Sequence, residues 1–192
     1  MNSHIISGKN SGVYTHWGSK LCPQLPGRAV QRIYAGYMVS SEQGDSGGSG
    51  QVICLTDTPH ISKMGSTQGR ISRVKPVSIA SDQQSNPLAH LLGNAIECSM
   101  CEVQSEPLII MLPGQSVCPF NWTLQYSGWL MTAHAVFRPL DFTCIDRTSP
   151  RTGIDVPGMS VVLDHVANWC TGCAPFSRYR YDQEIQCIVC SK

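Results

Sequence analysis

The sequence predicts an all-β protein built of two similar, disulfide-stapled β-rich subdomains in tandem. Ten cysteines, an even number, stand in 192 residues, of which only 14% are charged. That composition is typical of a turn-rich protein that forms disulfides in an oxidising compartment. Short β-branched and aromatic segments alternate with Gly, Pro, Asn and Ser clusters, as in strands joined by turns. Finally, the same short phrases occur in both halves of the chain, which indicates an internal duplication.

The duplication rests on landmarks that recur in one order. Each half contains a Cys-Pro dipeptide, an aromatic-x-Gly-aromatic segment, an isolated cysteine followed by an aspartate, and a closing Cys-x-x-Cys pair. They lie at Cys22, 34–38, Cys54 and 97–102 in the first half, and at Cys118, 126–131, Cys144 and 186–190 in the second. We therefore expect an N-terminal tail (1–11), a first subdomain (12–103) and a second subdomain (104–192). Residues 60–86 form a long polar insertion in the first, which we expect to be flexible or to contact a partner.

The expected secondary structure is a series of short strands. The segments rich in β-branched and aromatic residues are 12–17, 32–39, 51–55, 107–112, 124–131, 142–146, 160–166 and 185–190. No window of 12 or more residues sustains an apolar period of 3.6. Residues 86–95 are expected to form one or two helical turns, with Asn86 as the cap and Gly93 as the stop.

Charge and hydropathy exclude two classes of partner. The formal net charge is +1 and no run of Lys and Arg occurs, so we expect no nucleic-acid partner. The apolar runs are too short to cross a bilayer, so no membrane insertion is expected. Cysteine usage instead favours a secreted, extracellular protein. The sequon Asn121-Trp122-Thr123 is compatible with secretion and makes Asn121 a possible glycosylation site.

Three Cys-x-x-Cys pairs raise the alternative of a zinc site. They are 98/101, 170/173 and 187/190, and the last two pairs are separated by 13 residues, a spacing that suits tetrahedral zinc. A four-thiolate site would leave Cys118 and Cys144 without partners. The repeat instead treats eight cysteines as two sets of four, with Cys170 and Cys173 as a local pair. We therefore favour structural disulfides and expect no metal and no cofactor.

Two segments resemble parts of a serine protease. Residues 44–48 (GDSGG) resemble the phrase that carries the nucleophilic serine of trypsin-like enzymes, and 129–136 resemble the phrase around the catalytic histidine. Ser46 and His134 would then be the catalytic candidates. Counted from the aromatic-x-Gly segments, however, both residues fall in the equivalent loop of the two halves. We interpret them as two versions of one turn and expect no enzymatic activity, with a Ser46/His134 hydrolase as the less favoured alternative.

The remaining polar and aromatic residues carry weaker signals. The scattered histidines and the four tryptophans are interpreted as surface or core residues. Asp57 and Asp146 follow the isolated cysteines and are expected to cap turns. A possible ligand edge for a glycan or an anionic partner is formed by Arg178, Tyr179, Arg180 and Tyr181, although alternation with period 2 is equally typical of an ordinary strand.

The order of these phrases resembles the carboxy-terminal non-collagenous domain of type IV collagen, and most closely that of the invertebrate short-chain collagen and spongin-like group. The similarity covers about residues 12–59 and 88–190. In that family the first cysteine of a subdomain pairs with the last, and the second with the one before last. The resemblance therefore implies the disulfides Cys22–Cys101, Cys54–Cys98, Cys118–Cys190 and Cys144–Cys187, with Cys170–Cys173 as a local bridge.

The resemblance also implies a function. It predicts a secreted, non-enzymatic extracellular module for assembly or for matrix and ligand binding, which forms homo-oligomers or binds a matrix or glycan partner. The chain departs from the family because it contains no Gly-X-Y tract, so these residues cannot form a collagen triple helix. The alternative is a secreted carbohydrate- or small-ligand-binding protein, lectin-like or with a role in defence or signalling, that has this fold without the collagen.

Overall fold

The fold is described from a computed structural model. It describes residues 10–41, 49–60, 74–79, 86–133, 137–156, 161–167, 178 and 183–192. Ten strands in these ranges form one sheet, and the helical structure among them is the 3-10 turn η1. The strands are β1 (Ser11–Trp17), β2 (Val30–Ser41), β3 (Val52–Thr56), β4 (Val74–Ile79), β5 (Glu97–Gln104), β6 (Ile109–Pro113), β7 (Thr123–Ala133), β8 (Thr143–Asp146), β9 (Val161–His165) and β10 (Gln186–Ser191). The expectation of an all-β protein is confirmed.

The two halves build ladders with the same strand order. The first ladder runs β1–β5–β2–β3 and the second runs β6–β10–β7–β8, and all of these pairs are antiparallel. The register is also equivalent: Gly36 faces Cys98 and Thr56, while Gly128 faces Cys187 and Asp146. The repeated phrases of the sequence therefore correspond to repeated strand pairings.

The glycine of the aromatic-x-Gly segment is required by close backbone packing. A Cβ atom on Gly36 would lie 1.8 Å from the carbonyl oxygen of Leu55, and one on Gly128 would lie 1.9 Å from that of Ile145. Contacts this short are forbidden for any side chain, so β3 and β8 can approach the central strand of their ladder only at glycine.

Disulfides connect each ladder on both faces. The structure contains Cys22–Cys101, Cys54–Cys98, Cys118–Cys190 and Cys144–Cys187, which are four of the five bridges implied by the resemblance. Cys170 and Cys173 lie outside the described residues. The closing cysteines are three residues apart on β5 and on β10, so their side chains leave opposite faces of the strand. Since Cys187 and Cys190 are both oxidised, they offer no thiolates to zinc.

Strand β4 differs from the expected polar insertion at 60–86. Val77 and Ile79 are fully buried, and β4 joins the two ladders by pairing antiparallel with β2 and parallel with β9. Pro76 disguised the strand in the sequence, because proline lacks the N–H that a central strand needs. It is tolerated because Pro76 lies where β4 changes partners: residues 74–76 pair with β2 and 77–79 pair with β9. This part of the segment is a core strand and not an insertion.

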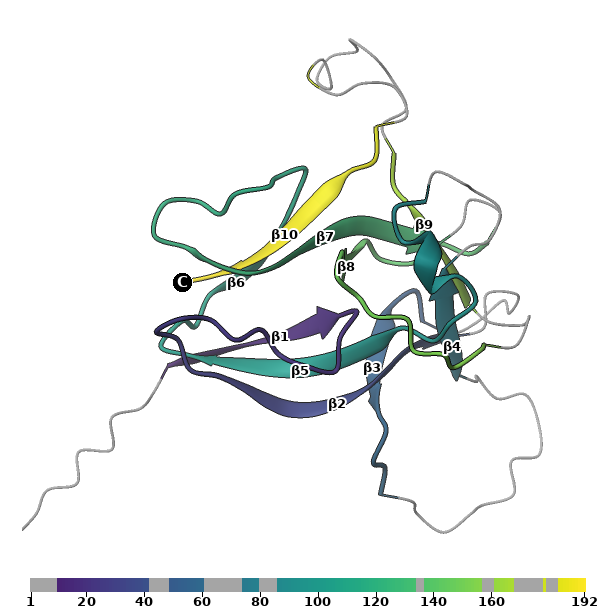
Figure 1. The fold of residues 1–192 in the computed structure, drawn as a ribbon, viewed down its shortest axis with the longest axis horizontal. Helices are drawn as coiled ribbons and strands as arrows, with labels where there is room; N and C mark the ends of the chain where they lie inside the picture. Colours follow the sequence, from purple (N-terminus) through teal and green to yellow (C-terminus); the bar gives the residue numbers. More distant parts are fainter. Residues whose placement is uncertain are drawn as a thin grey trace, which may run out of the picture.

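Figure 1 shows how the sheet folds over itself. Strands β1, β5 and β2 form one layer, β7 and β10 lie above it, and β4 and β9 stand at the end where one layer passes into the other. The interior between the layers is shared. One apolar cluster contains Met38 and Val77 together with Met131 and Ile145, and a second contains Tyr14 together with Tyr126. Each cluster thus draws on both halves of the chain.

The 86–95 segment closes one end of the shared core. The 3-10 turn η1 (Ala89–Leu91) follows Asn86, whose Oδ1 accepts the N–H of Leu88 at 2.9 Å. The expected short helical turn is therefore present, but its N-cap is Leu88, and Asn86 forms a side-chain turn that precedes it. Leu88 and Leu91 are buried against the cluster that contains Ile145.

Replacing a buried residue of β4 should destabilise the whole fold. Ile79→Ala removes apolar contacts from the shared core, so we expect the free energy of unfolding to fall by about 2–5 kcal/mol. The exposed neighbour Val74 on the same strand is the matched control, and Val74→Ala should change stability by less than about 0.5 kcal/mol. Denaturant unfolding of the oxidised protein measures both. Equal, small effects would show that β4 is not part of the core.

Candidate functional site

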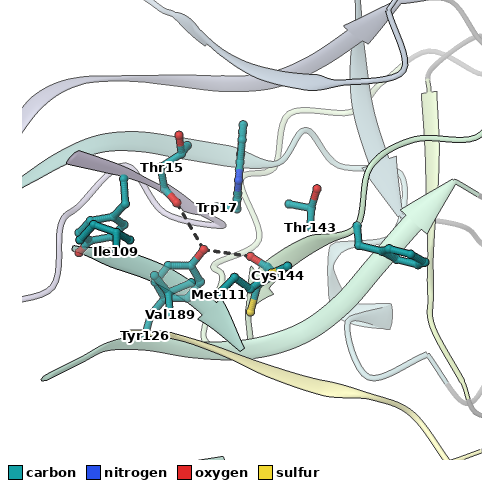
Figure 2. Close-up of a pocket in the computed structure, with 10 residues that line it drawn as sticks. Thr15, Trp17, Ile109, Met111, Tyr126, Thr143, Cys144 and Val189 are labelled. Carbon is teal, nitrogen blue, oxygen red and sulfur yellow. Dashed lines mark hydrogen bonds between the residues drawn. The ribbon is translucent and has the colours of Figure 1, made fainter. Parts of the chain in front are cut away.

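The candidate site is the junction where β1 of the first ladder crosses the second ladder. Figure 2 shows the hydroxyl of Tyr126 between Thr15 on β1 and Cys144 on β8. It donates to the backbone oxygens of both residues, at 3.3 Å and 3.1 Å respectively. Because a hydroxyl has one proton, the two bonds alternate or share it. Tyr126 therefore connects three strands from two ladders at one buried point.

A buried His–Asp pair lies beside this tyrosine. His16 on β1 places Nε2 2.5 Å from Oδ2 of Asp146 on β8, and both side chains are buried. The His16 ring also packs on the Tyr126 ring, with centroids 4.4 Å apart. The other oxygen of Asp146, Oδ1, accepts the N–H and the hydroxyl of Thr148 at 2.7 Å and 2.8 Å. Asp146 thus caps a turn, as expected, and also binds the other half of the chain.

Both ring nitrogens of His16 are engaged within the protein. Nδ1 lies 2.9 Å from the carbonyl oxygen of Leu21, and Nε2 lies 2.5 Å from Oδ2 of Asp146. Both partners are hydrogen-bond acceptors. Because neither ring nitrogen is free to exchange a proton with a ligand, the arrangement does not support acid–base catalysis by His16.

Burial and hydrogen bonding set the pKa values at the junction. Burial raises the pKa of Asp146, but the hydrogen bonds from His16 and Thr148 together outweigh it and hold the pKa below its ordinary value. Burial raises the pKa of the Tyr126 and Tyr14 hydroxyls well above the ordinary tyrosine value. Both tyrosines are therefore neutral donors at any physiological pH.

A second polar chain crosses the same interface. The Tyr14 hydroxyl donates to Oε1 of Gln125 at 2.8 Å, and Nε2 of Gln125 donates to Oγ of Ser191 at 2.7 Å. The Ser191 hydroxyl donates to buried Glu106, which also pairs with Nε of Arg28 at 2.5 Å. Every member of this chain has a partner, so it fixes the positions of β1, β7 and β10 relative to one another.

Two hollows open beside the junction. One, of about 210 Å³, is lined by Trp17, Met111, Phe142 and the Tyr126 hydroxyl among others, and is the pocket drawn in Figure 2. The other, of about 380 Å³, lies over the His16–Asp146 pair and next to Leu21 and Leu124. Both are shallow clefts between ladders, and the polar groups at their base are engaged within the protein.

Most sequence candidates fall outside the junction. Ser46, His134, Tyr179, Arg180 and Tyr181 lie outside the described residues, while Arg178 and Asn121 are exposed. The two described residues, Arg178 and Asn121, do not line either hollow at the junction.

The two aspartates singled out in the sequence are not equivalent. By register, Asp146 corresponds to Thr56, and Asp57 corresponds to Arg147. Asp57 is exposed and pairs with Nζ of Lys20 at 2.7 Å. One signal in the sequence pointed to the junction: the second half has Asp146 where the first half has Thr56. Nothing in the sequence pointed to His16 as its partner.

No protein-family model matches the chain. Among the described residues, no cluster of three or more His, Cys, Asp and Glu side chains could hold a metal ion, and no helix is long and apolar enough to cross a membrane. The four disulfides indicate a non-cytosolic, oxidising compartment.

Breaking the His16–Asp146 pair should destabilise the protein strongly. His16→Ala leaves the buried Asp146 carboxylate without its partner, and we expect the free energy of unfolding to fall by about 3–5 kcal/mol. The double variant His16→Ala/Asp146→Ala should lose less than the sum of the two single variants, because no buried member of the pair is then left without its partner. A double-mutant cycle in denaturant measures this coupling. Additive effects would contradict a direct buried pair.

The same pair should make stability fall in acid. Since the pKa of Asp146 is lower in the folded protein than in the unfolded chain, its carboxylate stabilises the fold above about pH 4. That contribution is lost as the pH falls through the folded-state pKa. We expect the stability difference between wild type and Asp146→Asn to shrink as the pH falls below about 4. Unfolding curves across this range measure it, and a constant difference would be the contrary result.

Proposed function

We propose that this protein is a secreted, non-enzymatic extracellular module that assembles with further copies of itself, as its resemblance to the non-collagenous domain of type IV collagen implies. The observation that carries the proposal is an inequality between the ladders. Strand β8 of the second ladder is buried, whereas its equivalent in the first ladder, β3, exposes large apolar residues.

Strands β3 and β8 make the inequality plain. All four residues of β8 are buried. By register, Ile53 corresponds to Thr143 and Leu55 corresponds to Ile145, yet Ile53 is 48% exposed and Leu55 is 44% exposed. Large apolar side chains exposed side by side are characteristic of protein contact surfaces. We call the surface of Ile53 and Leu55 on β3 the β3 surface.

Tyr34 and Tyr126, the equivalent tyrosines of the two ladders, also differ in burial. Tyr34 donates to the Cys54 carbonyl at 3.1 Å, as Tyr126 does to the Cys144 carbonyl at 3.1 Å. Tyr126 is then covered by Thr15 and His16 of β1, whereas Tyr34 is half-buried. One chain thus contains a ladder that is covered by its neighbour and an equivalent ladder whose corresponding surface faces outward.

A second copy is the partner that fits this surface. The elements that cover β8 come from the other half of the same chain, including Leu88 and Leu91 of the η1 region. A head-to-tail contact, in which the second half of one copy covers β3 of the next, would repeat the packing found within the chain. Such heterologous contacts generate rings when the rotation closes.

Self-association through the β3 surface is testable. We expect sedimentation velocity to show a concentration-dependent oligomer, and Leu55→Glu to weaken its association at least tenfold by placing a charge in an apolar contact. Val13, exposed on β1 and outside both hollows, is the matched control, and Val13→Glu should leave association unchanged. Both variants should keep the wild-type unfolding free energy within about 0.5 kcal/mol.

Two outcomes would refute the assembly proposal. The first is a protein that stays monomeric at concentrations up to about 100 μM, well above the dissociation constants of specific complexes. The second is an oligomer that responds equally to Leu55→Glu and Val13→Glu.

A further inference from the structure

We propose that Asn121 carries an N-linked glycan whose first sugar packs against the exposed ring of Phe120. The site lies in the loop between β6 and β7, on the second ladder, and is independent of the assembly proposed for the β3 surface. Three observations on this loop support it: an exposed acceptor, a rigid backbone and an aromatic ring without packing partners in the core.

The acceptor side chain is displayed on a tight turn. The N–H of Trp122 donates to the carbonyl of Pro119 at 3.0 Å, and Asn121 adopts a left-handed conformation with φ 64° at the tip. Asn121 is exposed there. Asparagine tolerates this conformation better than most residues, so turn formation alone could explain its presence. The neighbouring residues distinguish a glycosylation site from a residue that serves only to form the turn.

Phe120 has no structural role that would explain its presence at the tip. Its side chain is 90% exposed, and Val117 in the same loop is 76% exposed. Neither residue belongs to an apolar cluster of the protein. An exposed phenylalanine adds no stability to the isolated fold and favours non-specific association. A pyranose ring presents C–H groups on one face, which pack on an aromatic ring, and a glycan on the adjacent residue would cover Phe120.

The loop is held in place on both sides. The Cys118–Cys190 disulfide ties it to β10, and the N–H of Gly114 donates to the carbonyl of Gln186 at 2.7 Å. The position of Asn121 relative to Phe120 is therefore fixed in the folded protein. A sugar attached there loses little additional backbone entropy on packing, because the loop is already ordered.

The order of synthesis leaves the sequon open for modification. In the folded protein the Thr123 hydroxyl donates to Oε1 of Glu106 at 2.9 Å, and Thr123 pairs with Ser191. Cys118 is joined to a cysteine 72 residues later. The pairing of Thr123 with Ser191 and the Cys118–Cys190 disulfide form only after the C-terminal strand has been synthesised, so neither restrains the sequon when it first enters the secretory compartment.

The modification is a group transfer from a lipid-linked oligosaccharide pyrophosphate. The amide nitrogen of Asn121 forms a bond to C1 of the first sugar, while the bond from C1 to the pyrophosphate oxygen breaks. The amide loses one proton and the lipid pyrophosphate leaves. No oxidant or reductant is needed, and the donor belongs to the secretory pathway in which the disulfides form.

The experiment uses the whole chain directed through the secretory pathway of a eukaryotic host that makes high-mannose glycans. Intact mass and peptide mapping should place one glycan on Asn121, and Asn121→Gln should remove it. Trimming with an endoglycosidase leaves only the first sugar, whereas peptide-N-glycosidase removes it as well and converts Asn121 to aspartate. The variant Asn121→Asp, which never carries a glycan, controls for that conversion.

The first sugar should account for the stabilisation. We expect the trimmed protein to keep the Tm of the full glycoform, and complete removal to lower Tm by about 2 °C or more. In the Phe120→Ser variant, complete removal of the glycan should change Tm little. In the Val117→Ser variant, it should lower Tm as much as it does in the wild type. An unmodified Asn121 in the secreted protein would overturn the proposal. So would a Tm loss of equal size in the Phe120→Ser and Val117→Ser variants.

Discussion

The contact of His16 with Asp146 is the interaction on which the arrangement of the two ladders depends. A buried charge is tolerated only with a partner in good geometry, so β1 cannot shift along the second ladder without leaving an unpaired ion. The Tyr126 ring, which packs against His16, and the polar chain from Tyr14 to Glu106 fix the same strand at neighbouring points. Apolar packing alone would permit several registers, whereas these directional contacts select one.

This arrangement makes one folding unit from two ladders of the same strand order. Each ladder has its own disulfides and its own glycine at the close approach of two strands, but the interior lies between the ladders and belongs to both. The parallel pairing of β4 with β9 adds a backbone connection at the far end. Because the second ladder is covered by the first, the equivalent surface of the first is left exposed. The asymmetry that we connect with assembly follows directly from joining two copies of an open ladder.

The sequence predicted the fold best at glycines and cysteines, because few structural roles explain either residue type at a recurring position. Paired landmarks, with glycine between aromatic residues and cysteines at fixed positions, indicated the repeated strand order, and eight of the ten strands were expected near their observed positions. Strand β4 was missed because Pro76 interrupts its pattern, and β5 was noted as a cysteine pair and not as a strand. The His16–Asp146 contact joins residues 130 positions apart and has no counterpart in the other half, so neither periodicity nor the repeat could indicate it.

Native-state hydrogen exchange tests most directly whether the two ladders form one cooperative unit. In mild denaturant, the amides of β2 and β5 in the first ladder and those of β7 and β10 in the second should exchange through the same global opening. They should therefore have one free energy and one denaturant dependence. Two well-separated opening free energies, one for each ladder, would show that the halves fold independently and would contradict the shared core and the His16–Asp146 connection.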